Sequence, residues 1–259
     1  MECGPGQCDE HEKVPNPPPD VQTFVDAART FTSDEYVPAI LRPGPLDPQT
    51  QARLTQRLHE FIGLAPAILT SADLRISSDR FQRELLRDEG KVTGRYDGRF
   101  AASAAGRHAS DNAFDPSYEA VEPAFGAAFS AYAKTELGWR TGQTYRVLPG
   151  EIVENWNFRR SGFYGRVLAP TVIPDLREAL RANPSLRVFV GSGLFDLATP
   201  LYATEYELAN VALDPAVRAR IAVGYYHSGH MIYLSDDALH ALRSDLGRFY
   251  SNAGSSVPG

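Results

Sequence analysis

An aspartate and a histidine in the last third of the chain have the residue types and positions for acid–base chemistry. Asp196 follows an expected strand in LRVFVGSGLFDLATP, and His230 follows a second expected strand in RIAVGYYHSGHMIYL. Side chains at the carboxyl ends of parallel strands meet at the edge of the sheet where α/β proteins bind ligands. A carboxylate beside an imidazole fixes the imidazole tautomer, so that the ring can act as a general base and acid. The sequence therefore predicts an Asp–His pair.

The elements expected around this pair alternate between helices and strands. Helices are expected from Pro174, from Thr199-Pro200 and from Ser235, because these residues favour helix N-termini. The apolar run Val188–Val190 predicts a strand buried on both faces, as in a parallel sheet, and residues 220–226 predict its neighbour. The order helix, strand, helix, strand, helix is typical of an α/β sheet.

The preceding part of the chain, residues 21–165, is expected to be mainly helical. Ser33 is followed by two acidic residues and indicates a helix start, and residues 48–62 carry apolar side chains at helical spacing. Residues 91–100 predict a small hairpin around a two-residue Asp-Gly turn. Asp115, which precedes a proline, begins a longer helix.

The composition indicates a folded globular protein and excludes several classes of function. The chain has 259 residues, of which 43% are hydrophobic and 22% charged, so it is not wholly disordered. No apolar run approaches the roughly 18 residues of a membrane-spanning helix, so no membrane partner is expected. The excess of 32 acidic over 26 basic residues argues against nucleic acid as a partner. Nothing in the sequence indicates a cofactor.

Both ends of the chain are expected to be flexible tails, residues 1–20 and 251–259. The proline-rich first segment lacks the basic and apolar regions of a signal peptide, so the sequence leaves the compartment open. Cys3, Cys8 and His11 offer a metal site in principle. A zinc site needs about four ligands held by a fold, however, so we expect two unpaired thiols and no metal there.

Several segments together resemble the serine carboxypeptidase family of α/β-hydrolases. GSGLFDLATP, TEYELANVALDP and YYHSGHMIYL are similar to the C-terminal end of that family, over residues 166–250. RFQRELLRDEGKVTGRYDGRFAASAA and DPSYEA are similar to the helical insertion of its bacterial members, within residues 21–165. The resemblance implies an α/β fold in which the last strands and helices of a hydrolase core follow a mainly helical cap.

The resemblance also implies an activity and roles for three residues. Members of the family release C-terminal amino acids from peptides, so the implied substrate is a peptide with a free C-terminus. Asp196 and His230 correspond to the aspartate and histidine of the catalytic triad. Met231 lies where the family lines the pocket for the substrate side chain. The family usually works in secreted, periplasmic or vacuolar settings.

The chain departs from the family in its nucleophile. In α/β-hydrolases the triad runs Ser, Asp, His, and the serine lies in a G-x-S-x-G turn, which this sequence lacks. Ser192 lies within an expected strand, and Ser161 fails the spacing. We expect the chain to begin after the nucleophile, so that Asp196 and His230 are two thirds of a triad.

Two alternatives follow from this departure. The chain is half of a split hydrolase and needs a partner with the N-terminal half, or it is a non-catalytic binding protein that kept the cleft. An apolar strand with an open edge also favours self-association. A metal site of His227 and His230 with Asp236 or Asp237 is weaker, because two histidines in a loop imply no fixed ligand geometry.

We predict that the purified 259-residue chain has no useful carboxypeptidase activity. The reason is that the family's serine nucleophile and the donors of its oxyanion hole have no counterpart in this sequence. The loss of even one oxyanion donor lowers a rate by ~10²–10³. The measurement is release of C-terminal amino acids from peptides. Trimming that disappears in His230→Ala would contradict the prediction.

Overall fold

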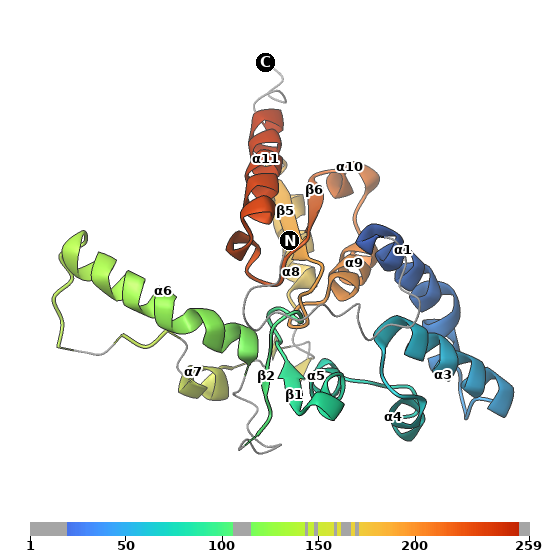
Figure 1. The fold of residues 1–259 in the computed structure, drawn as a ribbon. Coiled ribbons are helices and arrows are strands. Elements are labelled where there is room, and N and C mark those ends of the chain that lie inside the picture. Colours follow the sequence, from blue (N-terminus) through green and yellow to red (C-terminus); the bar gives the residue numbers. More distant parts are fainter. Residues whose placement is uncertain are drawn as a thin grey trace. The chain divides into compact units, whose positions relative to one another are not determined.

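The computed structural model describes most of the chain (Figure 1). The described residues are 20–105, 115–142, 145–147, 150–157, 160–161, 167–168 and 171–253. Most of the two expected tails lies outside this part, as do Cys3, Cys8 and His11. The expected boundary between residues 165 and 166 also lies outside it. Residues 251–253 are helical, however, so the expected start of the C-terminal tail at residue 251 is wrong.

The chain divides into two compact units, and each is described by itself. The first unit contains the residues up to Ser117 together with two later segments, Gly193–Tyr202 and His227–Met231. The second unit contains Tyr118–Ser192, Ala203–Tyr226 and the residues from Ile232 onward. The segments that carry Asp196 and His230 therefore group with the N-terminal region.

Aspartate side chains begin the two longest helices of the first unit. Asp20 caps the first helix by accepting a hydrogen bond from the backbone N–H of Thr23 (2.8 Å). Asp47 accepts in the same way from the N–H of Thr50 (2.9 Å), and this bond lowers the pKa of the Asp47 carboxyl. The helical elements are α1 (Val21–Phe31), a π-helical turn (Thr32–Tyr36), α2 (Val37–Ile40), α3 (Pro48–Ile62), α4 (Pro66–Ser71), α5 (Ser78–Glu84) and a 3₁₀ turn (Arg87–Glu89).

The helix start expected at Ser33 is wrong, whereas the helix expected over residues 48–62 is confirmed as α3. The backbone is already helical from Val21, because Asp20 provides the cap. The Ser33 hydroxyl instead donates to the carboxylate of the next residue, Asp34 (2.6 Å), and lies 3.3 Å from the carbonyl of Thr30 in the same helical stretch. A short polar residue indicates a helix start only where the preceding chain is not helical.

A single apolar core holds these helices together. Phe31 stacks on Phe61 with 5.0 Å between ring centroids, and the guanidinium of Arg57 lies 5.0 Å from the Phe61 ring. The hydroxyl of Tyr36 donates to the carbonyl of Leu74 (2.7 Å), and burial raises the pKa of this tyrosine. The buried members of the core are Phe31, Leu54, Leu58, Leu64, Leu69, Leu74, Leu85 and Leu86.

The hairpin expected over residues 91–100 exists, but its turn is longer than two residues. Strand β1 (Lys91–Thr93) pairs antiparallel with β2 (Ala101–Ser103). Gly94 N–H donates to the carbonyl of Phe100 (2.8 Å), and Phe100 N–H donates to that of Asp97 (3.1 Å). The first bond closes a wide connection, residues 94–100, and the second closes a tight turn within it over residues 97–100, so the prediction of a two-residue Asp97-Gly98 connection between the strands is wrong. The same loop is hydrogen-bonded to both segments that carry the Asp–His pair.

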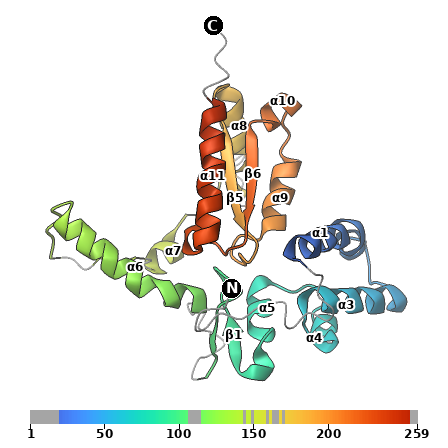
Figure 2. The same cartoon turned by 45° about the horizontal axis from the view of Figure 1, so that its top comes forward.

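The second unit contains a two-stranded sheet and most of the later helices (Figure 2). Its helix over residues 116–135 follows Asp115 as expected, and Pro123 lies inside it. The elements from there to the chain's end are α6 (Pro116–Thr135), α7 (Gly150–Asn155), β3 (Arg160–Ser161), β4 (Val167–Leu168), α8 (Ile173–Ala182), β5 (Val188–Gly193), α9 (Leu201–Asn210), α10 (Pro215–Arg218), β6 (Ile221–Tyr226), a 3₁₀ turn (Ile232–Leu234) and α11 (Asp236–Ala253).

Strands β5 and β6 are neighbours and run in the same direction. Val188 N–H donates to the carbonyl of Arg220 where both strands begin (3.0 Å). Phe195 N–H donates to the carbonyl of Ser228 just past their ends (3.1 Å). The hydrogen-bonded partners have increasing residue numbers along both strands, which is the pattern of parallel strands. The expected alternation of helix and strand from residue 173 to the final helix is confirmed.

Two contacts fix the helices of the second unit to this sheet. Phe249 of α11 packs edge-on against Phe189 of β5, with 5.6 Å between ring centroids. The Arg220 guanidinium donates to the carbonyls of Leu180 (2.5 Å) and Asn183 (2.8 Å), which end α8. The last carbonyls of a helix have no partner within the helix, and Arg220 supplies donors to two carbonyls at the end of α8.

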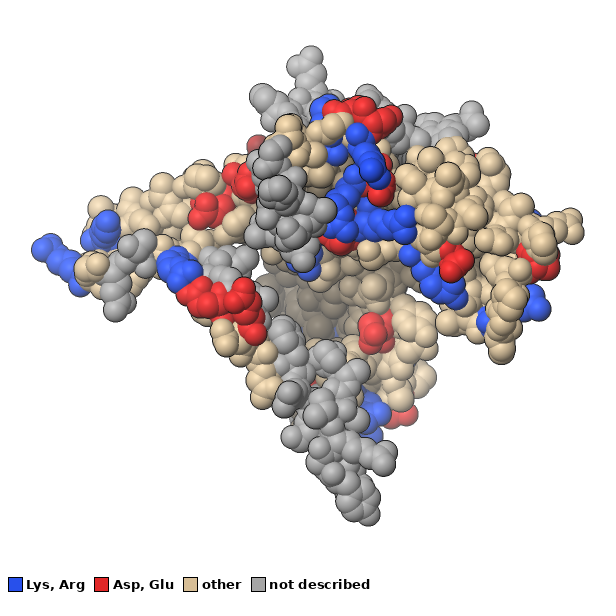
Figure 3. Space-filling model, turned by 90° about the horizontal axis from the view of Figure 1, so that it is seen from below, with Lys and Arg blue, Asp and Glu red and all other residues tan. Residues whose placement is uncertain are grey.

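The expected burial of β5 on both faces is wrong. Val188, Phe189 and Val190 are half-buried, because within the described residues the sheet that contains them has only two strands. The chain is therefore a mixed α/β protein in which helices predominate. None of the helices described here has the length and apolar character to cross a membrane. On the face drawn in Figure 3, basic and acidic side chains are intermixed.

We predict that Leu54→Ala lowers the free energy of unfolding by about 2–5 kcal/mol, because it leaves a cavity in a closed apolar core. Leu54 is 0% exposed, and urea titration gives the measurement. Leu41→Ala is the matched control, since Leu41 is 75% exposed and its replacement removes little packing. Equal effects of the two substitutions would contradict the assignment of the core.

Candidate functional site: an Asp–His pair

Asp196 is fixed by the backbone of its own turn. Its side chain is only 5% exposed, and Oδ1 accepts hydrogen bonds from the N–H groups of Ala198 (2.8 Å) and Thr199 (2.9 Å). The Thr199 hydroxyl donates to Oδ2 (2.5 Å). This Asx turn precedes α9 and holds the carboxylate in one orientation. One lone pair of Oδ2 remains available to a further donor.

His230 supplies that further donor. Its Nδ1 lies 2.8 Å from Oδ2 of Asp196, so the two residues singled out by the sequence are brought together. The imidazole is 41% exposed, and its backbone N–H donates to the carbonyl of Tyr96 (2.6 Å). The Tyr96 ring lies against the imidazole, with 5.1 Å between centroids and 42° between planes.

This geometry selects the imidazole tautomer that acid–base catalysis requires. An ionised carboxylate only accepts hydrogen bonds, so the proton of a neutral His230 lies on Nδ1. Nε2 then carries the lone pair, and it has no hydrogen bond to any residue in the described part of the chain. The pair can take a proton at Nε2, because Asp196 stabilises the imidazolium that forms.

Two glycines permit the close approach of the segments that carry the pair. A Cβ atom on Gly193 would lie 2.2 Å from the carbonyl oxygen of Gly229. A Cβ atom on Gly229 would lie 2.4 Å from the carbonyl oxygen of Tyr96. Real Cβ atoms do not come so near to backbone atoms, so any side chain here would push the segments apart.

Sequence reasoning missed two residues of the site. Thr199 was expected only as a helix start, yet its hydroxyl lies 2.5 Å from Oδ2 of Asp196 and 3.3 Å from Nδ1 of His230. A threonine three residues after the aspartate is a detectable signal for such a turn. Tyr96 lies in the hairpin loop, far from His230 in sequence, and local patterns carry no signal for that contact.

The other residues that the sequence analysis considered for the site take no part in the Asp196–His230 bond itself. Met231 follows His230 and is half-buried, and its role in lining a substrate pocket stays a prediction. Ser192 lies within β5 and is buried, not at a strand-to-helix turn. His227 packs its ring on Phe195 (4.8 Å between centroids), and the described residues include no group of three possible metal ligands. Ser161 lies in β3, and its side chain is outside the described part.

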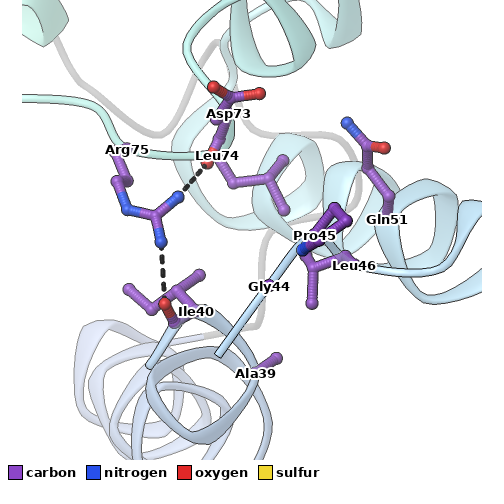
Figure 4. Close-up of a pocket in the computed structure, with 9 residues that line it drawn as sticks. All are labelled: Ala39, Ile40, Gly44, Pro45, Leu46, Gln51, Asp73, Leu74 and Arg75. Carbon is purple, nitrogen blue, oxygen red and sulfur yellow. Dashed lines mark hydrogen bonds between the residues drawn. The ribbon is translucent and has the colours of Figure 1, made fainter. Parts of the chain in front are cut away.

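A pocket in the first unit is lined by other residues (Figure 4). Arg75 lies at its wall and donates to the carbonyls of Ile40 (2.7 Å) and Asp73 (3.1 Å). Asp73 and Leu74 have positive φ angles of 48° and 63° there. The guanidinium is thus used in holding the turn that follows α4. The other lining residues are Ala39, Gly44, Pro45, Leu46 and Gln51.

Comparison of the chain with protein-family models, with curated proteins and with solved structures finds no match.

We predict that Gly193→Ala lowers the free energy of unfolding and weakens the Asp196–His230 contact, because the new methyl group would collide with the Gly229 carbonyl. Thermal unfolding measures the first effect, and NMR of the His230 ring measures the second. Gly247→Ala is the control, since it lies in α11 with nothing within 4 Å of the new atom. Alanine there is expected to be neutral or to stabilise the helix by up to about 1 kcal/mol.

Proposed function

We propose that Asp196 and His230 are the acid–base pair of a hydrolase of the serine carboxypeptidase type. The observation that carries the proposal is the 2.8 Å contact between Nδ1 of His230 and Oδ2 of Asp196. It lies just past the ends of two parallel strands, β5 and β6. The order aspartate before histidine is that of α/β-hydrolases, and the sequence motifs around both residues resemble the carboxypeptidase family.

The proposal includes the finer architecture. Residues 166–250 form the last strands and helices of an α/β-hydrolase core, and residues 21–165 belong to its helical cap. The parallel β5–α9–β6 arrangement supports this, because a helical crossover between parallel strands is the repeating unit of such cores.

The chemistry assigned to His230 follows from its free nitrogen. Nε2 takes the proton of a serine hydroxyl as the serine oxygen attacks the scissile carbonyl of the peptide. The imidazolium returns this proton to the leaving amine, which departs as the C-terminal amino acid. A water molecule then attacks the acyl-serine, Nε2 takes its proton, and return of that proton to the serine releases the shortened peptide. Asp196 keeps the proton of the neutral ring on Nδ1 throughout.

The serine is assigned to a polypeptide segment outside the 259 residues, since no G-x-S-x-G sequence occurs among them. The activity is therefore expected from the protein together with the chain that supplies the serine. A protein that only binds peptides would keep the cleft and show no reactive serine.

The test captures the tagged chain under native conditions from cells that normally make it. A fluorophosphonate probe labels activated serines, and an N-blocked dipeptide reports release of the C-terminal amino acid. We expect a labelled serine in the captured material and dipeptide hydrolysis. Asp196→Asn and His230→Ala are expected to lower kcat/KM by about 10⁴-fold or more, because each breaks the triad.

Two matched variants separate this loss from general damage. His240→Ala and Asp214→Asn replace exposed residues of the same types on α11 and before α10, and should leave the rate unchanged. Absence of any labelled serine, with peptide bound but not cleaved, would overturn the proposal in favour of a binding protein. Hydrolysis that survives both Asp196→Asn and His230→Ala would overturn it as well.

A further inference from the structure

The hairpin loop between β1 and β2 is bonded to both segments that carry the Asp–His pair. The Tyr96 carbonyl accepts from the N–H of His230 (2.6 Å). On the other segment, the Arg95 carbonyl accepts from the N–H of Leu197 (3.0 Å), directly after Asp196. Gly98 N–H donates to the carbonyl of Phe195, directly before Asp196 (2.9 Å). Residues 95–98 therefore fix the backbone on both sides of Asp196 and at His230.

The same loop is itself held by two buried polar side chains, Asp115 and Ser117. The Asp115 carboxylate accepts from the N–H groups of Arg95 (3.0 Å, at Oδ1) and Tyr96 (3.2 Å, at Oδ2). The Ser117 hydroxyl oxygen accepts from the N–H groups of Tyr96 (3.1 Å) and Asp97 (3.2 Å). Three consecutive backbone donors are thus satisfied by two side chains that lie where α6 begins.

Asp115 and Ser117 are also tied to each other. Ser117 donates its N–H (2.9 Å) and its hydroxyl to Oδ1 of Asp115. Asp115 is 9% exposed and Ser117 1%, so these bonds are shielded from water. In the described part of the chain no Lys or Arg side chain pairs with Asp115, and all of its bonds go to backbone and hydroxyl donors. A Cβ atom on Gly94 would lie 2.7 Å from Oγ of Ser117, so the loop fits closely.

Tyr96 links Asp115 and Ser117 to the imidazole of His230. Its N–H is held by Asp115 and Ser117, its carbonyl holds the N–H of His230, and its ring lies against the imidazole. A shift of Tyr96 therefore moves His230 directly, whereas the carboxylate of Asp196 is also held by the N–H groups of its own turn. Catalytic geometry tolerates little movement, because a displacement of 1 Å can lower a rate by about 10²-fold.

We propose that Asp115 and Ser117 are positioning residues for His230 and act on it through Tyr96. The inference rests on the proposed function in one respect: positioning matters for catalysis only if the Asp–His pair is the acid–base pair. The structural link from Asp115 to the imidazole can be measured without any activity.

The experiment is NMR of the full chain labelled with ¹⁵N at histidine. The ring nitrogens report which tautomer His230 adopts, and the Nδ1 proton reports how often its bond to Asp196 opens. Asp115→Asn keeps the side chain's shape but replaces an accepting oxygen with an NH₂ group. We expect the Nδ1 proton of His230 to exchange about fivefold faster, the factor that the net strength of one hydrogen bond allows.

Ser117→Ala is the second variant, and it decides the question if Asp115→Asn fails to fold. It removes the hydroxyl oxygen that accepts from the N–H groups of Tyr96 and Asp97. The Nδ1 proton of His230 is therefore expected to exchange faster here as well. The control is Asp245→Asn. Asp245 accepts from the hydroxyl of Tyr226 (2.8 Å) in the second unit, so its replacement affects stability but not the His230 ring.

The outcomes separate the two proposals. If Asp196→Asn leaves the tautomer and the Nδ1 proton of His230 as they are in the unmodified chain, the Asp–His pair itself is refuted, and the proposed function with it. If Asp196→Asn alters both but Asp115→Asn and Ser117→Ala only lower the melting temperature, the positioning role is refuted and the proposed function stands. A change at His230 in Asp245→Asn of the same size would also refute the positioning role.

Discussion

The close backbone approach of the segments after β5 and β6 is the constraint on which the site depends. Gly193 and Gly229 carry no side chains, so the carbonyl of Gly229 can lie 2.2 Å from the place that a Cβ of Gly193 would occupy. The distance between Asp196 and His230 is therefore set by two short stretches of backbone. Backbone anchored in this way moves less than two long side chains would, and this accounts for a direct 2.8 Å bond to a ring that is 41% exposed.

The N-terminal region supplies a third segment of backbone that is hydrogen-bonded to these two. The loop between β1 and β2 provides carbonyls for the N–H groups of Leu197 and His230, which belong to the same unit as the loop. These N–H groups have no helix or sheet partner of their own, and burying them unpaired would cost free energy. The segments Gly193–Tyr202 and His227–Met231 thus complete their hydrogen bonds with residues about a hundred positions earlier in the chain.

Sequence patterns located the elements and the pair, but not the contacts that fix the pair. Helix α3 and strands β5 and β6 follow from local periodicity and apolar runs, and the Asp–His pair follows from where those strands end. The wide loop after β1 could not be predicted, because its shape depends on Asp115 and Ser117, about twenty residues further along. The half-buried state of β5 was also missed, since an apolar run indicates a strand without giving its number of neighbours.

The role of Thr199 is partly local, and so predictable from sequence, and partly dependent on the folded chain. Its place before a proline indicated a helix start, and that much was correct, because α9 begins at Leu201. The bond from its hydroxyl to Asp196 is local, so a rule for Asx turns finds it from sequence. The proximity of the same hydroxyl to His230 depends on the sheet and is visible only in the folded chain.

The two oxygens of Asp196 have separate uses, and this affects how the residue would be retained in evolution. Oδ1 closes the turn before α9 through two backbone N–H groups, whereas Oδ2 accepts from the Thr199 hydroxyl and pairs with His230. If the proposed function holds, a lineage that lost it would still be selected to keep the aspartate for its turn. The histidine ring closes no backbone turn: it is 41% exposed, bonds to Asp196 and lies against Tyr96. Under the proposed function, retention of His230 rather than of Asp196 would therefore mark those descendants of this chain that keep the acid–base activity.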